Sequence, residues 1–183
     1  MKLHLVRHGT TSSGGRTYAG RSDVPLSEDG IRMSRQLVDG LGKAPIGAIL
    51  SSPLRRAMDT AAPLARFRGL EVQTNPLLLE IDFGKLEGKP KADLGLVLRK
   101  THARAPIPGG EALIDVWNRA ERFLADLTEH HDADAAEVVI VGHFWINRML
   151  YGLINAMDFE TTCRSRSYRP ETGSVATLEW QSR

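Results

Sequence analysis

The sequence predicts a three-layer α/β/α sandwich, in which a mostly parallel central sheet lies between two layers of helices. Short apolar runs typical of strands alternate along the 183 residues with longer stretches whose apolar residues recur at helical spacing. Hydrophobic residues make up 42% of the chain and charged residues 25%, as in soluble globular proteins. No internal repeat, low-complexity tract or linker divides the sequence, so we expect a single domain over residues 1–183.

The first half of the chain predicts two strand–helix pairs. Leu3–Val6 is a short apolar run, and the helix after the next loop should begin at Ser27, whose hydroxyl can cap it ahead of two acidic residues. Ile46–Leu50 is a second apolar run, and the following helix should be capped by Ser52 with Pro53 at its first position. The apolar faces of the two helices are formed by Ile31, Leu37, Val38 and Leu41, and by Leu54, Ala57, Met58, Ala61 and Ala65.

The second half adds strands and helices around a Gly- and Pro-rich region. We expect a third strand over Glu71–Leu79, a short helix near Ala92–Leu98, a long helix from Glu111 and a buried strand at Val138–Val141. The apolar positions are Leu113, Val116, Trp117, Ala120, Leu124 and Leu127 in the long helix, Ile146, Met149, Leu150 and Leu153 in the next helix, and Ala176, Leu178 and Trp180 in a last strand. Because such sheets bind ligands outside the carboxyl ends of their strands, residues 80–110 are predicted to form a lid or insertion over an active-site mouth.

The charge balance excludes several classes of protein. The formal net charge is +2, but the first 70 residues hold 11 Lys and Arg against 5 Asp and Glu. This local surplus is too small for a nucleic-acid-binding protein. The single Cys163 cannot form an internal disulfide, which favours a cytoplasmic location. No apolar run approaches the roughly 20 residues of a membrane helix, and the first residues do not form a signal peptide.

Two histidines follow predicted strands at the same end of the sheet. His8 stands in the run LVRHG and His143 in VVIVGH, and the carboxyl ends of parallel strands can lie side by side. Arg7 adjoins the first histidine, and Arg56 lies near the start of the helix after Ile46–Leu50. Each histidine alone is more often a structural residue, but such a cluster of cations needs an anion. A phosphoryl group suits guanidinium donors, whose charge-assisted hydrogen bonds are worth about 1.5 to 3 kcal/mol each.

These residues lie in six ordered blocks. The blocks are LVRHGTT at 5–11, GRSDVPLS at 20–27, SSPLRRA at 51–57, LEIDFG at 79–84, PGGE at 108–111 and VGH at 141–143. Together they resemble the histidine phosphatase superfamily, also called the phosphoglycerate mutase-like family. The resemblance implies the phosphoglycerate mutase-like form of the α/β fold.

The resemblance also implies roles for individual residues. His8 would be the nucleophile that takes the phosphoryl group, and Glu80 would be the proton donor. The anion pocket would be formed by Arg7, Arg56 and His143. Arg55, which precedes the functional arginine, is interpreted as a surface residue. The family's chemistry requires no metal and no cofactor, and the partner is a small phosphorylated substrate rather than a nucleic acid or a membrane.

The chain departs from the family's pattern at several positions. Gly14 stands where members often carry an asparagine, so a phosphate ligand is either missing or replaced by Thr11 or Ser13. Phe144 and Trp145 follow the second histidine where small residues are common. Backbone N–H groups at that helix start could still face an anion.

The predicted function is a metal-independent phosphomonoesterase that works through a phosphohistidine. The short span from Glu80 to His143 favours the phosphatase branch, and the GRSDVPLS block is similar to α-ribazole phosphatases, which makes α-ribazole 5'-phosphate the first candidate substrate. The alternatives are a phosphoglycerate mutase, a sugar-phosphate phosphatase such as a fructose-2,6-bisphosphatase, or a phosphohistidine phosphatase. A non-enzymatic phosphate-binding regulatory protein is the alternative of another class. The sequence leaves the oligomeric state open.

Three other patterns are weaker. Cys163 and Arg169 have the C-x5-R spacing of cysteine phosphatases, but no apolar strand precedes the cysteine. Asp132–Asp134 is similar to an aspartyl nucleophile pair and also lacks a preceding strand. His130–His131 are adjacent, so they cannot share one helical face as i, i+4 metal ligands do.

Overall fold

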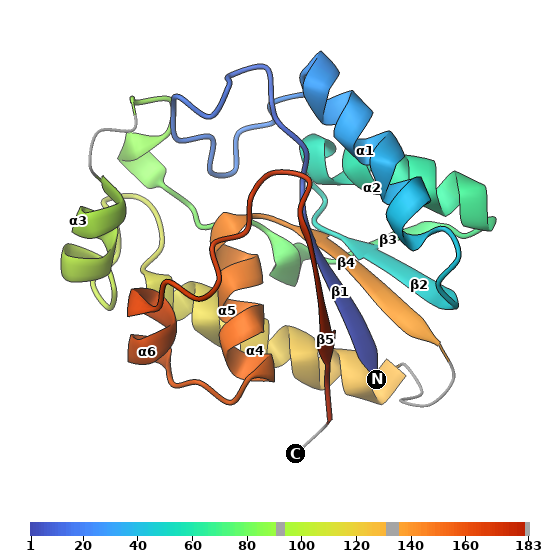
Figure 1. Ribbon diagram of the computed structural model, residues 1–183. Coiled ribbons are helices and arrows are strands. Elements are labelled where there is room, and N and C mark those ends of the chain that lie inside the picture. Colours follow the sequence, from blue (N-terminus) through green and yellow to red (C-terminus); the bar gives the residue numbers. More distant parts are fainter. Residues whose placement is uncertain (91–93, 131–135, 182–183) are drawn as a thin grey trace.

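The computed structural model describes residues 1–90, 94–130 and 136–181 and contains a five-stranded sheet (Figure 1). The strands are β1 (Lys2–Arg7), β2 (Ile46–Ser51), β3 (Val72–Thr74), β4 (Glu137–Gly142) and β5 (Val175–Glu179). Their order across the sheet is β3-β2-β4-β1-β5, in which the first four are parallel and β5 is antiparallel to β1. The predicted mostly parallel sheet is therefore confirmed.

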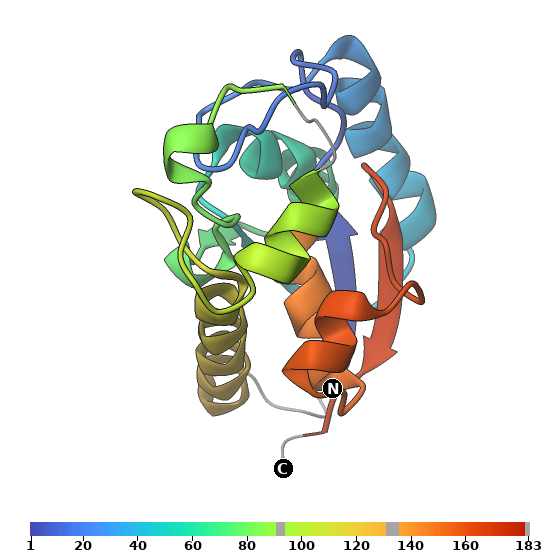
Figure 2. The same ribbon diagram turned by 90° about the vertical axis from the view of Figure 1, so that its left-hand side faces the viewer.

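Alternating side chains of the strands are buried on opposite faces of the sheet. In β4, Val138 and Ile140 contact one layer of helices, and Val139 and Val141 contact the other. Helices α1 (Glu28–Leu41) and α2 (Arg55–Arg68) cover one face, and α4 (Leu113–His130), α5 (Phe144–Ile154) and α6 (Phe159–Arg164) cover the other (Figures 1 and 2). Helix α3 (Leu94–Thr101) lies outside the second layer (Figure 2). This arrangement confirms the three-layer sandwich.

The two predicted helix caps have different outcomes. Ser27 caps α1, because its Oγ accepts a hydrogen bond of 3.1 Å from the Gly30 N–H. The prediction for Ser52 and Pro53 is wrong, since α2 begins at Arg55. The Ser52 hydroxyl is instead 2.8 Å from Nε2 of His143, a residue that follows β4. A buried histidine nitrogen offers this hydroxyl a stronger partner than the helix start, whose nearest N–H is 3.4 Å away.

The middle of the chain differs from prediction in two elements. The strand expected over Glu71–Leu79 stops at Thr74, because Pro76 has no N–H for the ladder and opens a 3₁₀ turn that Asn75 caps. The short helix expected near Ala92–Leu98 is α3, which continues to Thr101. Helix α6 was not predicted from the sequence, since its six residues are too few to show a period.

The loop after β1 is packed tightly against the first turn of α1. A Cβ atom on Gly30 would lie 2.1 Å from the Thr10 carbonyl oxygen, and one on Gly9 would lie 2.7 Å from the Gly30 carbonyl oxygen. Only glycine therefore allows the first turn of α1 to contact the loop after β1. The same loop is joined to the C-terminal segment, because the Gly173 N–H donates to the Arg7 carbonyl at 2.9 Å. These contacts hold the chain that carries His8.

The weaker sequence patterns find no support in the described part of the chain. Cys163 lies inside α6, where burial raises the pKa of its thiol to about 11, so it is protonated at neutral pH. Asp132–Asp134 and His131 lie outside the described residues. Among the described helices, none is both long and apolar enough to cross a membrane.

Candidate active site

A cavity of about 550 Å³ opens at the carboxyl end of the sheet. Its walls come from the loop after β1, the start of α2, the segment after β3, α3, the start of α5 and the loop before β5. The residues that line it are Arg7, His8, Thr10, Thr11, Ser13, Gly14, Gly15, Thr17, Tyr18, Ala19, Gly20, Arg56, Glu80, Phe83, Leu98, Phe144, Trp145 and Thr172. Four of the five residues predicted for the site therefore line one cavity, and His143 lies behind it.

The imidazole of His8 is fixed by its own backbone. Its Nδ1 is 2.7 Å from the Gly9 carbonyl oxygen, which can only accept, so Nδ1 carries the proton and donates. In the neutral ring the lone pair is then on Nε2. The backbone N–H of His8 donates to the Gly142 carbonyl at 3.1 Å, which ties the residue to β4. His8 is 8% exposed, so its ring lies in a largely buried part of the cavity wall.

Arg56 and His143 form a buried pair beside His8. The Arg56 Nε–H donates to His143 Nδ1 at 3.3 Å, which leaves the proton of the neutral ring on Nε2, where it is donated to Ser52 Oγ. The rings of His143 and His8 are 5.1 Å apart. His143 has no exposed surface, and its burial, together with the charge of Arg56, holds its pKa well below the usual 6.5. His143 is therefore neutral at pH 7 and holds Arg56 in place.

The guanidinium of Arg56 also organises the opposite wall. Its Nη1 donates to the Ser22 carbonyl at 2.8 Å and its Nη2 to the Gly20 carbonyl at 2.6 Å. Arg56 is 1% exposed, and burial lowers its pKa while the charge of Glu80 opposes the shift. A planar donor held at three points keeps its remaining N–H groups in fixed directions.

Arg7 supplies the second cation. Its Nη1 donates to the Pro170 carbonyl at 2.8 Å, and its guanidinium carbon lies 5.3 Å from the centre of the Phe144 ring. Burial lowers the pKa of Arg7, and Glu80 again opposes this. Its Nε is buried and has no hydrogen-bond partner among the described residues. The buried Arg56 and the partly buried Arg7, close to one carboxylate, leave a surplus of positive charge, which suits a bound anion.

Glu80 is held at the N-terminus of α5. Its carboxylate accepts the Trp145 N–H at 3.1 Å on Oε1 and 3.3 Å on Oε2, and Oε1 also accepts the Ile81 N–H at 3.0 Å. The helix start after His143, which the sequence suggested for a bound anion, therefore faces the protein's own carboxylate. The side chain is 7% exposed and reaches the cavity wall. These contacts orient a group that can exchange protons with a ligand.

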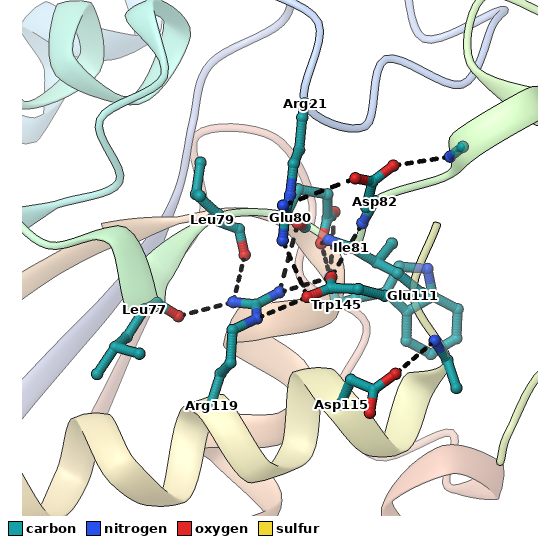
Figure 3. Close-up of polar contacts among 12 residues, drawn as sticks. Arg21, Leu77, Leu79, Glu80, Ile81, Asp82, Glu111, Asp115, Arg119 and Trp145 are labelled. Carbon is teal, nitrogen blue, oxygen red and sulfur yellow. Dashed lines mark hydrogen bonds and ion pairs between the residues drawn. The ribbon is translucent and has the colours of Figure 1, made fainter. Parts of the chain in front are cut away.

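Arg119 supports the chain that carries Glu80, as Figure 3 shows. From α4 its Nη1 donates to the Leu77 and Leu79 carbonyls at 2.8 and 2.9 Å, and its Nη2 to the Glu80 carbonyl at 3.4 Å. The same guanidinium makes a two-point ion pair with Glu111, at 3.1 Å for each contact. Sequence reasoning missed Arg119, which belongs to no block.

Glu111 links this support to the opposite wall of the cavity. Besides Arg119, it accepts a hydrogen bond from the Arg21 guanidinium at 2.9 Å and from the Asp82 N–H at 3.0 Å (Figure 3). The Arg21 N–H in turn donates to Glu87 Oε1 at 2.8 Å. The PGGE block pointed to Glu111, but it did not indicate that the carboxylate joins two segments of the site.

The glycine-rich part of the loop after β1 carries hydroxyl groups into the cavity. Thr11 Oγ1 and Ser13 Oγ are 3.0 Å apart, and both residues line the wall. Gly14 and Gly15 have φ values of 59° and 68°, a left-handed conformation that glycine adopts without strain. Gly14 brings no side chain to the site, so the two neighbouring hydroxyls are the polar groups of this turn.

Comparisons with known proteins agree with this geometry. The family model described as "Histidine phosphatase superfamily (branch 1)" matches residues 3–183. Phosphoserine phosphatase 1 of Hydrogenobacter thermophilus is 32% identical over 168 residues, which are 86% of this chain and 78% of that protein. A protein of Proteus mirabilis named as a probable phosphoglycerate mutase is 34% identical over 68% of this chain and 61% of its own length. The crystal structure of the α-ribazole phosphatase from Shigella flexneri matches with a TM-score of 0.83 and 28% identity over 97% of this chain and 89% of that one.

Proposed function

The chain belongs to the histidine phosphatase superfamily, branch 1, and on this basis we propose that it hydrolyses a small phosphomonoester through a phosphohistidine on Nε2 of His8. Its family and its relatives, which include phosphatases, support a phosphatase enzyme. One observation carries the proposed mechanism: His8, Arg7, Arg56 and Glu80 line the same cavity, with the His8 proton held on Nδ1.

In the first step the Nε2 lone pair of His8 attacks phosphorus. The nitrogen–phosphorus bond forms as the bond to the leaving oxygen breaks. Arg7 and Arg56 face the charge on the equatorial oxygens, and the Nδ1 hydrogen bond to Gly9 stabilises the positive charge that the ring gains. Neutral His143 adds no competing charge beside His8. The step depends on positioning and charge compensation, which this rigid arrangement supplies.

Glu80 handles the protons of both half-reactions. The leaving alkoxide takes a proton from the Glu80 carboxyl. The resulting carboxylate then takes a proton from a water molecule as the oxygen of that water attacks phosphorus. The nitrogen–phosphorus bond breaks, its electron pair returns to Nε2, and inorganic phosphate leaves.

A test of the nucleophile is p-nitrophenyl phosphate hydrolysis with EDTA present. We expect turnover without added metal, and a loss of about 1,000-fold or more in His8→Ala. Enzyme quenched in alkaline denaturant should carry an acid-labile phosphoryl group that is absent from the variant. Activity that requires added metal, or that survives the substitution, refutes the mechanism. Binding of phosphate without any turnover would instead support a regulatory phosphate-binding protein.

A test of the proton donor compares good and poor leaving groups. Glu80→Gln should lower kcat for phenyl phosphate by about 100-fold or more, while p-nitrophenyl phosphate, whose leaving group needs little help, is affected far less. Glu121→Gln, an exposed carboxylate on α4, is the matched control and should leave both rates unchanged. Equal losses on both substrates in Glu80→Gln would remove Glu80 from this role.

α-Ribazole 5'-phosphate is the first candidate substrate, supported by the GRSDVPLS block and by the likeness to the Shigella flexneri enzyme. The Proteus mirabilis relative favours a second candidate function, phosphoglycerate mutase. A panel of phosphorylated metabolites should include α-ribazole 5'-phosphate, phosphoserine and 3-phosphoglycerate, the last also with a bisphosphorylated primer. Isomerised phosphoglycerate would identify a mutase. Released phosphate would support the phosphatase.

A further inference from the structure

The charges on the described wall of the cavity are concentrated where the phosphate is proposed to bind. Arg7 and Arg56 are its basic residues and Glu80 its acidic residue. Apart from His8, the other lining residues are glycines, hydroxyl-bearing residues, an alanine, a leucine and aromatic residues. The described lining residues thus offer one site for an anion, next to the proposed nucleophile.

One cation beside the cavity, Arg21, is already paired. Arg21 follows the lining residue Gly20, but its guanidinium contacts Glu111 at 2.9 Å and Asp82 at 3.6 Å (Figure 3). A carboxylate or second phosphate elsewhere on the substrate would therefore lose water without gaining a counter-charge from the described lining residues. Burying such a charge is strongly unfavourable.

Aromatic rings supply most of the apolar wall. Phe144 and Trp145, at the start of α5, are 5.2 Å apart between ring centres and nearly perpendicular at 87°. Tyr18 and Phe83 form a second pair at 4.8 Å. Of these four rings only Phe144 is partly exposed, and Arg7 holds it from one side. Its ring is therefore the most exposed of the four aromatic rings on the cavity wall.

The size of the cavity leaves room beyond a phosphate. Its volume of about 550 Å³ falls in the range of sites that hold whole small molecules. Leu98 of α3 adds a buried apolar contact to the same wall. The space around the phosphate site is thus suited to a flat group of low polarity.

We propose, on the premise of the phosphatase function above, that the cavity selects monophosphates whose leaving group is uncharged and carries a flat apolar or aromatic ring. Phe144 is the specificity-determining residue that contacts this ring. Its place directly after His143 puts the contact beside the reacting phosphate. Substrates with a carboxylate or a second phosphate on the leaving group are disfavoured.

A first experiment compares phenyl phosphate, 1-naphthyl phosphate and 4-carboxyphenyl phosphate. The last differs from the first only by a carboxylate, which makes its phenolate a slightly better leaving group. We expect kcat/KM for 4-carboxyphenyl phosphate to be lower by about 10-fold or more, the effect of an unpaired charge at a buried site. Equal or faster hydrolysis of the carboxylated substrate, or a preference for phosphoserine over 1-naphthyl phosphate, overturns the proposal.

A second experiment tests Phe144. Phe144→Ala should lower kcat/KM for 1-naphthyl phosphate by about 3- to 10-fold, as expected for a lost aromatic contact, and should change kcat/KM for propyl phosphate by less than about 2-fold. For 1-naphthyl phosphate, the kcat/KM of Phe144→Leu should lie between the values for the wild type and Phe144→Ala. Phe67→Ala removes a ring that is 62% exposed on α2 and should change neither value. Equal losses on both substrates would show that Phe144 acts through Arg7 and would refute its role in specificity.

Binding measurements separate this inference from the proposed function. If the protein hydrolyses none of these esters, the phosphatase function fails, and calorimetry with benzylphosphonate and 2-carboxyethylphosphonate still tests the cavity. Tighter binding of benzylphosphonate, by about 10-fold or more, supports selection of an uncharged ring. Tighter binding of the carboxylated ligand refutes it.

Discussion

Arg119→Met removes the guanidinium that supports Glu80 but retains an apolar side chain of similar length. The wild-type side chain donates to three carbonyls in the Leu77–Glu80 segment and pairs with Glu111 through two contacts of 3.1 Å. The exposed fractions of the Arg119 and Glu111 side chains are only 9% and 18%, so solvent does little to replace the lost contacts. The substitution therefore tests whether this network stabilises both the fold and the proposed proton donor.

The expected loss of stability follows from these contacts. Removing one partner of a buried ion pair costs about 3 to 5 kcal/mol, because the other charge stays buried. Glu111 keeps Arg21 and the Asp82 N–H, which places the loss near the lower end. The three carbonyls lose a charged donor, but such losses are not additive. We expect the free energy of unfolding to fall by about 3 kcal/mol, less than the 5 to 15 kcal/mol of a typical domain, so the variant should still fold.

The expected loss of activity depends on the leaving group. A loosened Glu80 segment should lower kcat for phenyl phosphate by about 10-fold, a part of the full effect of a general acid, and change kcat for p-nitrophenyl phosphate by less than about 2-fold. Stability is measured by urea unfolding, and kcat by phosphate release at saturating substrate. Arg122→Met, on the exposed side of α4, is the matched control. A stability loss below about 1 kcal/mol together with an unchanged ratio of the two rates would refute the reasoning.

Further predictions concern the protonation of His143, the close contact between Gly30 and Thr10, and the Ser27 cap of α1. Because the pKa of His143 is lowered by folding, the unfolded chain takes up a proton below pH 6.5 that the folded chain does not. The free energy of unfolding should therefore be highest above pH 6.5 and fall by up to about 1.4 kcal/mol per pH unit below it. In His143→Asn, the free energies of unfolding measured in urea should vary less between pH 7.5 and 5.5. Gly30→Ala should lower the free energy of unfolding by about 1 to 3 kcal/mol, because the new Cβ would meet the Thr10 carbonyl oxygen. Gly40→Ala, on the same helix, places its Cβ in open space and should raise the free energy of unfolding by about 0.4 to 1 kcal/mol. A lower free energy of unfolding in Gly40→Ala would contradict this reasoning. Ser27→Ala should cost about 1 kcal/mol in the same measurement, and no change would show that its bond to Gly30 contributes nothing.

The placement of His8 and His143 could be predicted because it depends on local pattern. Each follows an apolar run that is long enough for one buried strand, and the carboxyl ends of parallel strands meet at one edge of the sheet. The identification of Glu80 required the family resemblance, since no regular element marks it. Its contact with the Trp145 N–H joins residues 65 positions apart, which no local pattern reveals.

Ser52 shows why local patterns mislead at the site. A serine before a proline is typical of a helix start, and this interpretation was wrong because a partner 91 residues away competes for the hydroxyl. His143 lies next to Ser52 only because β4 lies beside β2 in the sheet. In the same way, Arg119 is one of several charged residues on α4, and its burial follows from the path of the Leu77–Glu80 segment over that helix.

The sequence by itself determined the α/β sandwich, the edge of the sheet where His8 lies and the positive charge gathered there, because strand and helix periods and chain-adjacent motifs are local properties. Only the tertiary structure decided that His143 is buried behind Arg56, that Glu80 occupies the start of α5, and that Arg119 and Glu111 support it. These features depend on which distant segments satisfy each buried donor and acceptor. That competition is settled only when the whole chain has packed.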